Sequence, residues 1–412
     1  MQIAVPRIPQ TRASQFDRLE RVRAIAPTLS SKAREGEDLT HLSDVALTTM
    51  KSEGLLHLLL PQELGGEQLG YVDAMELLEL LAAADGAAGW YAMVANAAAA
   101  SVGAFLPDRG AERIYGADPR AMVAGQGGPR GTAKQVEGGY LVNGPWAYGS
   151  TIYHADYFHS GCVVTDGNGA IATESDGKPR AIVCHFPKEQ GKLAGNWDTL
   201  GLRGTGSYDY DVATVDLFVP EHMTFPFTAG LPQRGGAQFS IGIVGITAWC
   251  HAAWALGPPR RALDELRIVA ANGSDRAASL ANSESFRLVY ADAEAKYRSA
   301  RAFIYEVWRD IDATLLGGGS VPFHQLTLAR MAMRHIHDVG SEITLFAYRA
   351  AGGAALRAGP LQRVFRDMHS ATQHMLVADQ IYQECGRVML GQVGPTAQWA
   401  GPRIVEHAGP RP

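Results

Sequence analysis

The most informative segment for the architecture runs from Gln135 to Ser150, QVEGGYLVNGPWAYGS. Two short apolar runs in it flank Glu137-Gly138-Gly139, and the second run leads directly into Asn143-Gly144. Glycine-rich and Asn-Gly turns between such runs predict β-hairpins. Short apolar runs bounded by turn residues continue from Ala121 to Pro226, where we expect roughly seven strands. The sequence therefore predicts a central β domain, an antiparallel barrel or sandwich.

Helical patterns lie on both sides of this β region. From about Phe16 to Tyr115, and again from Phe239 onward, apolar residues recur at spacings of three and four. Long helices with short breaks predict an antiparallel bundle in the C-terminal part. The predicted fold class is therefore α+β, mostly α, with three domains: an N-terminal helical domain (1–118), a β domain (119–230) and a C-terminal helical bundle (231–412).

Capping and breaking residues predict where individual helices begin and end. Ser43 is expected to cap a helix that runs to Ser52, and Pro258-Pro259 is expected to start a new helix. Gly359-Pro360 should open the last long helix, which is expected to carry His374 and to continue past it.

The composition argues against several classes of partner. A chain of 412 residues with net charge -5 lacks the basic clusters that nucleic acid or an anionic membrane surface requires. Its four cysteines are far apart, so neither a zinc site nor a disulfide framework is expected, and a reducing cytoplasm is the simplest location. Gly86 to Leu106 is long enough to span a membrane, but it is rich in Ala and Gly, so we predict an interior helix.

Two glycine-rich segments and one histidine pair are poor candidates for familiar sites. A dinucleotide fingerprint needs a strand before it and a helix after it, but β structure is expected after both Gly125–Gly131 and Gly201–Gly206. His335 and His337 would point in different directions from a helix, so no metal site is predicted. His335 lies on the apolar stripe and is expected to be a core histidine.

Trp146, Tyr148 and Ser150 alternate along the sequence, which would place all three on one face of a strand. A flat ligand with polar edges can stack on such a face and accept a hydrogen bond from Ser150. The alternative is that the two aromatic residues only cap the barrel.

Two further segments carry polar groups suited to a site. Thr205 and Ser207, in a loop before a strand, offer hydroxyl and backbone N–H groups to an anion or a cofactor edge, although turns of this composition are common. Ser370 and His374 lie three and seven residues after Asp367, on one side of a predicted helix. A partly buried structural histidine is the alternative for His374.

Over residues 20–391 the chain resembles the acyl-CoA dehydrogenase-fold flavoproteins. Within them it is similar to the flavin-dependent monooxygenase branch, the oxygenase components of two-component hydroxylases. The strings that carry the resemblance are VEGGYLVNGPWAYGS (136–150), WDTLGLRGTGSYD (197–209), FVP (218–220) and PLQRVFRDMH (360–369), together with His374.

The resemblance implies a homotetramer that holds flavin between the β domain and the C-terminal bundle. It implies catalytic roles for His374 and Ser150, with His374 also facing the substrate. Trp90, at the start of the Ala-rich helix, is expected to form a wall of the substrate pocket, with ordinary core packing as the alternative. Gly352 and Gly353 would reach flavin in an adjacent subunit. The other residues implied to bind the cofactor are Trp146, Tyr148, Ser150, Gln126, Gly127, Thr205 and Ser207.

The resemblance also implies the reaction. Reduced flavin (FADH2 or FMNH2), supplied by a separate reductase, would react with O2 to give a C4a-(hydro)peroxide that oxygenates a small aromatic or heteroaromatic substrate. His374 would act as the base or would orient the peroxide. An acyl-CoA dehydrogenase-like FAD oxidoreductase is one alternative, but Thr372-Gln373-His374-Met375 stands where that reaction needs a carboxylate. A non-catalytic flavin-binding or scaffold protein is another.

Overall fold

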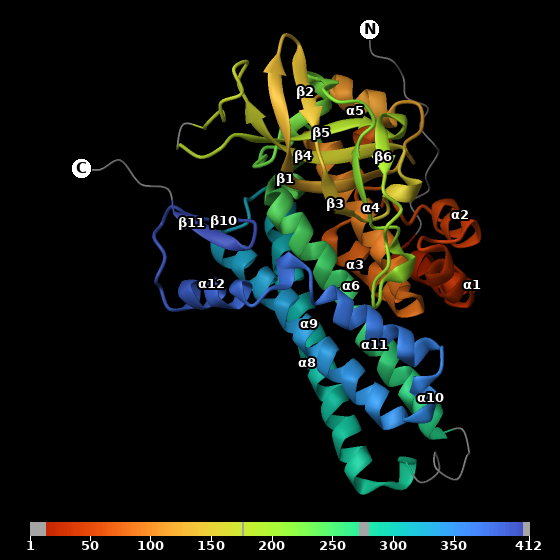
Figure 1. Cartoon of the computed structure of the whole chain (residues 1–412). Coiled ribbons are helices and arrows are strands. Elements are labelled where there is room, and N and C mark those ends of the chain that lie inside the picture. The colour runs from red at the N-terminus through yellow and green to blue at the C-terminus, as the bar shows by residue number, and fades with distance from the viewer. Residues whose placement is uncertain (1–13, 175–176, 272–279, 407–412) are drawn as a thin grey trace.

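A computed structural model describes residues 14–174, 177–271 and 280–406 and shows three parts in chain order. N-terminal helices lie against a β domain, and a long helical bundle extends away from both (Figure 1). This arrangement confirms the predicted fold class.

The N-terminal part is helical, as the spacing of its apolar residues predicts. Ser43 caps its helix as predicted, because its side chain accepts a hydrogen bond from the Ala46 amide. Nearly every residue of the Ala-rich helix is buried inside the protein, as expected for an interior helix. The helices are α1 (Gln15–Leu39), α2 (Asp44–Ser52), η1 (Gln62–Leu64), α3 (Tyr71–Ala84), α4 (Gly86–Phe105) and α5 (Asp108–Tyr115).

The β domain contains two sheets rather than one simple antiparallel barrel. All strand pairs in these sheets are antiparallel except β1 with β4, which is parallel, so the antiparallel prediction is wrong at that pair. The larger sheet has the order β8 (Leu217–Pro220), β2 (Gly139–Asn143), β1 (Val123–Val136), β4 (Tyr157–Thr165), β5 (Ala181–Pro187) and β9 (Thr224–Pro226). The smaller sheet has the order β3 (Trp146–Gly149), β7 (Tyr208–Val212) and β6 (Gly191–Leu193).

The C-terminal part is a helical bundle that ends in a short hairpin. The hairpin, which the sequence did not predict, packs its buried Trp399 near the last helix. The elements are η6 (Gly236–Ile241), α6 (Gly242–Ala271), α8 (Glu284–Leu316), α9 (Phe323–Ala351), α10 (Gly353–Leu356), α11 (Pro360–Ala371), η7 (Met375–Val377), α12 (Gln380–Met389), β10 (Ala397–Ala400) and β11 (Arg403–Glu406).

Helix α6 does not break at Pro258-Pro259, so the prediction of two helices is wrong. Both prolines are buried, and the packing of this segment outweighs the backbone hydrogen bonds that proline cannot make. Close packing on α3 is visible at Gly257, where a Cβ atom would lie 2.4 Å from the Ala83 nitrogen.

The stretch Gly236–Ala271 is also the one described helix that is long and apolar enough to cross a membrane, and 72% of its apolar window is buried inside the protein.

The last long helix ends earlier than predicted. Helix α11 begins at Pro360 as expected but stops at Ala371, so His374 follows the helix instead of lying on it. Side chains at this end bond to nearby backbone: Thr372 donates to the His369 carbonyl, and His374 Nδ1 accepts from the Leu376 amide. Such local bonds compete with helix continuation.

Gly257→Ala tests the close contact between α3 and α6. The added methyl group would meet the α3 backbone, so we expect the free energy of unfolding to fall by about 1–3 kcal/mol in urea denaturation. Gly386→Ala in α12 is the matched control, since its Cβ meets no atom within 4 Å. That variant should be neutral or slightly more stable. Equal effects of the two changes would contradict the packing argument.

Candidate active site

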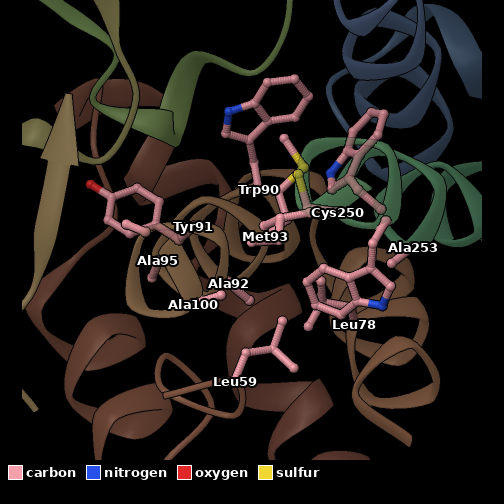
Figure 2. Close-up of a cluster of buried hydrophobic side chains, with 14 of the residues drawn as sticks. Leu59, Leu78, Trp90, Tyr91, Ala92, Met93, Ala95, Ala100, Cys250 and Ala253 are labelled. Atoms are coloured by element: carbon pink, nitrogen blue, oxygen red, sulfur yellow. The ribbon is translucent and has the colours of Figure 1, made fainter. Parts of the chain in front are cut away.

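Trp90 of α4 brings two predicted site residues together. Its indole Nε1 donates a hydrogen bond to Ser150 Oγ at 3.0 Å, and its ring centroid lies 6.2 Å from that of His374. Figure 2 shows that Trp90 and its neighbour Tyr91 leave α4 in different directions. Ser150 and His374, from the β domain and the C-terminal part, are therefore within reach of one side chain.

The hydroxyl groups of Ser150, Ser207 and Thr205 form a chain of hydrogen bonds. Ser150 Oγ lies 2.8 Å from Ser207 Oγ, which lies 2.7 Å from Thr205 Oγ1. Thr205 Oγ1 donates to the Leu202 carbonyl at 2.8 Å. Thr205 and Ser207 are buried, whereas Ser150 is partly exposed. The structure thus joins the two predicted loops, and Ser150 is the member that a ligand can reach.

The loop that carries Thr205 and Ser207 is held by α11. The Leu202 amide donates to Asp367 Oδ1 at 2.6 Å, and the Gly201 amide donates to Ser370 Oγ at 2.9 Å. Gly201 approaches α11 so closely that a Cβ atom would lie 2.2 Å from the carbonyl carbon of Arg366. Asp367 and Ser370, predicted to share a helix side with His374, therefore position the hydroxyl loop.

Burial makes Asp367 an unusual acid. Loss of hydration raises its pKa to about 7, although the hydrogen bond from Leu202 opposes this shift. The nearby carboxylates of Asp85 and Glu37 raise the pKa further, because like charges disfavour ionisation. Folding therefore favours the protonated form of Asp367.

His374 is neutral at physiological pH. The residue is partly exposed, but burial of its ring lowers its pKa to about 4. Because Nδ1 accepts from the Leu376 amide at 3.3 Å, the proton of the neutral ring lies on Nε2. The imidazole therefore offers an N–H donor to a ligand.

Two further histidines lie near His374, and neither is predicted from the sequence as a site residue. The His251 ring of α6 is centred 4.3 Å from the His374 ring, and His337 of α9 lies 6.2 Å from His251. Both are buried, and His251 Nδ1 and His337 Nε2 have no hydrogen-bond partner in the described part of the chain. His337, and not the partly exposed His335, is the core histidine, so that prediction is wrong. Met333 and Ile336 are buried on the same side of α9 as His337. Reading the apolar side of this helix from these two residues would have predicted His337 as the core histidine.

Trp146, Tyr148 and Ser150 do not share one face of a strand. Tyr148 has φ 60 and β3 changes register between Trp146 and Gly149, so the two-residue alternation fails. Trp146 is 1% exposed and Tyr148 is 70% exposed. The Trp146 indole donates to the Gly161 carbonyl at 2.8 Å and stacks on Tyr210 in the core of the β domain. The predicted cofactor contacts of Trp146 and Tyr148 stay predictions.

The remaining predicted cofactor residues lie in two places. The backbone amide of Gln126 in β1 donates to Tyr210 Oη at 2.9 Å. The buried side-chain oxygen of Gln126 has no hydrogen-bond partner in the described chain. Gly127 follows it at the bulge of β1. Gly352 and Gly353 lie where α9 meets α10, at the end of the bundle remote from the β domain (Figure 1). Their contact with flavin in an adjacent subunit stays a prediction.

The same question applies to metal ligands among the residues that the structure describes. In these ranges, no group of three or more His, Cys, Asp or Glu side chains is arranged to hold a metal ion.

The fold and the sequence together define the class of protein. Residues 19–106 match the acyl-CoA dehydrogenase N-terminal domain, and residues 249–379 match the acyl-CoA dehydrogenase C-terminal domain. The chain belongs to the acyl-CoA dehydrogenase fold family.

Similar proteins place the chain in one branch of that family. It is 31% identical to an indole-3-acetate monooxygenase of Pseudomonas putida over 90% of this chain and 93% of that protein. It is 29% identical to the flavin-dependent monooxygenase oxygenase subunit HsaA of Rhodococcus jostii, over 86% of this chain and 93% of HsaA. The structure of a 3-HSA hydroxylase from Rhodococcus sp. RHA1, 26% identical, has a TM-score of 0.81 and covers 91% of this chain and 96% of its own. The protein is an oxygenase component of a flavin-dependent monooxygenase.

The residues around Trp90 suit a flavin. A reduced flavin supplies the electrons that activate dioxygen, and its ring presents flat apolar faces and polar edges. The partly exposed Ser150 hydroxyl and the His374 N–H, beside an aromatic wall, match such a ring. The buried Gln126 side-chain oxygen, which lacks a partner in the described chain, is a further polar group of the β domain.

Asp367→Asn tests the effect of the buried acid on stability. A carboxyl group whose pKa is raised from 3.8 to about 7 binds a proton on folding, so its contribution to stability is present below pH 4 and is lost as the pH rises to 7. Asn keeps an oxygen for the Leu202 amide but cannot ionise. Between pH 4 and 7 the variant should gain stability relative to the wild type, by on the order of 2–4 kcal/mol in urea titrations. Parallel pH curves would contradict the raised pKa.

Proposed function

We propose that this oxygenase component inserts one oxygen atom of O2 into a small aromatic or heteroaromatic substrate at the site beside Trp90. The observation that carries the proposal is that one indole side chain contacts both Ser150 and His374. The names of the relatives support an aromatic substrate, since they include monooxygenases of indole-3-acetate and a resorcinol hydroxylase.

Each residue has a role that follows from its chemistry. Ser150 would meet the polar edge of the flavin, and the His374 Nε2–H would donate a hydrogen bond to the reacting oxygen or orient the substrate hydroxyl. Because Nδ1 is taken by the Leu376 amide and Nε2 carries the proton, this arrangement favours the peroxide-orienting role over the role of base that the sequence also suggests. Trp90 would form a wall of the substrate pocket and help to exclude water. Gln126, Gly127, Gly352 and Gly353 are proposed to hold other parts of the cofactor.

The arrangement argues against acyl-CoA dehydrogenation. That reaction removes a proton next to a thioester and requires a carboxylate base at the site. Asp379, the nearest acid after His374 in the sequence, is exposed and accepts a hydrogen bond from Arg334 at 2.9 Å. Glu384, the next acid, lies on the separate helix α12, where it is buried and accepts a hydrogen bond from Arg387 at 2.8 Å. His374 stands in its place as a neutral imidazole.

We propose further that the protein is a cytoplasmic homotetramer assembled through its C-terminal bundle. The bundle exposes large apolar side chains that a second copy would cover, among them Leu288 (71% exposed), Leu316 (89%) and Leu356 (70%). Such an assembly would also bring Gly352 and Gly353 of one copy toward the flavin of another.

His374→Ala tests the role of the imidazole. With chemically reduced flavin, ¹⁸O2 and an aromatic substrate, we expect incorporation of ¹⁸O into product to fall by about 10²–10³-fold, the usual effect of removing one hydrogen-bond donor to a reacting oxygen. His374→Gln, which keeps an N–H donor, should retain more activity. The control is His335→Ala on α9, which should behave like the wild type. Unchanged incorporation by His374→Ala would refute the assigned role.

The source of electrons is testable separately. The purified chain alone should not consume NADH, because no dinucleotide-binding pattern occurs in its sequence. Addition of an unrelated NADH:flavin reductase and free flavin should start product formation. NADH oxidation by the chain alone would contradict a separate reductase.

A further inference from the structure

The hydroxyl groups of Ser150, Ser207 and Thr205 can donate their hydrogen bonds in only one direction along the chain. Thr205 has a single hydroxyl proton and donates it to the Leu202 carbonyl, which can only accept. In the contact of 2.7 Å with Thr205, Ser207 must therefore be the donor. With its proton committed, Ser207 must accept from Ser150 in the contact of 2.8 Å.

Trp90 occupies another position around the Ser150 oxygen. Its Nε1–H donates to Ser150 Oγ at 3.0 Å, so the Ser150 proton cannot point toward Trp90. With the proton directed to Ser207 and one lone pair taken by Trp90, one lone pair remains. Ser150 is partly exposed, whereas Ser207 and Thr205 are 2% and 0% exposed. A ligand therefore meets Ser150 as a hydrogen-bond acceptor.

We propose that Thr205 and Ser207 are positioning residues that fix Ser150 as an acceptor, and that the protein thereby selects reduced over oxidised flavin. The inference rests on the proposed function. Reduction converts a ring nitrogen of flavin from a bare acceptor into an N–H donor. As an acceptor, Ser150 Oγ can form a hydrogen bond with this N–H of reduced flavin. In oxidised flavin the same nitrogen presents a lone pair, so Ser150 Oγ gains no hydrogen bond from it.

This assignment changes the roles that the sequence predicts for three residues. Ser150 is predicted to donate a hydrogen bond to the ligand, but the chain of hydroxyl groups makes it an acceptor. Thr205 and Ser207 were expected to contact the cofactor directly, but both are buried behind Ser150. Their hydroxyls act on the ligand through the direction of the Ser150 proton.

Thr205→Val tests the proposal by removing the end of the chain with little change in shape. The Ser207 proton then turns to Ser150, and the Ser150 proton is released toward the ligand. Anaerobic fluorescence titrations with FMN, FAD and their photoreduced forms give the ratio of the oxidised to the reduced dissociation constant. This ratio should exceed one for the wild type and should fall about tenfold in Thr205→Val.

Two controls accompany this variant. Thr205→Ser keeps the hydroxyl and should keep the wild-type ratio. Thr344→Val removes another buried hydroxyl, which donates to the Gly340 carbonyl of α9, and should also leave the ratio unchanged. If Thr205→Val does not fold, Ser207→Ala removes the acceptor of the Ser150 proton and should lower the ratio in the same direction.

The outcomes separate this inference from the proposed function. An unchanged ratio in folded Thr205→Val or Ser207→Ala, or a wild-type ratio of one, overturns the proton-direction argument alone. A wild-type protein that binds neither flavin form overturns the proposed function and this inference together.

Discussion

The hydrogen bond from the Trp90 indole to the Ser150 hydroxyl is the contact on which the site depends. It ties helix α4 to the edge of the β domain at the point where His374 of the C-terminal part approaches the same ring. Asp367 and Ser370 add a second tie, because they hold the loop that leads to Thr205. All three parts of the chain must therefore fold before the site exists.

Most of the fold could be predicted from periodicity and turn residues, because those signals are local. The prediction failed where distant packing decides the structure. Pro258-Pro259 is a local break signal, yet α6 continues through it since both prolines are buried in the bundle. The parallel pairing of β1 with β4 depends on how the chain crosses between strands, which hairpin signals cannot show.

The site could be predicted in part. His374, Ser150, Thr205 and Ser207 follow from a resemblance to a known family, and the structure gathers the last three into one hydrogen-bonded chain beside His374. The prediction that Trp146 and Tyr148 share one face of a strand is wrong, because Tyr148 has a left-handed backbone conformation that breaks the two-residue alternation. His251 and His337 lie on two different helices, so no spacing in the sequence brings them together.

A crystal structure of the protein soaked with reduced flavin under anaerobic conditions would show whether Ser150 and His374 serve one flavin ring. We expect one polar edge of the flavin ring to lie within hydrogen-bond distance of Ser150 Oγ, with the His374 imidazole facing the same ring beside Trp90. Flavin bound elsewhere, or bound with Ser150 and His374 contacting no common ring, would contradict it.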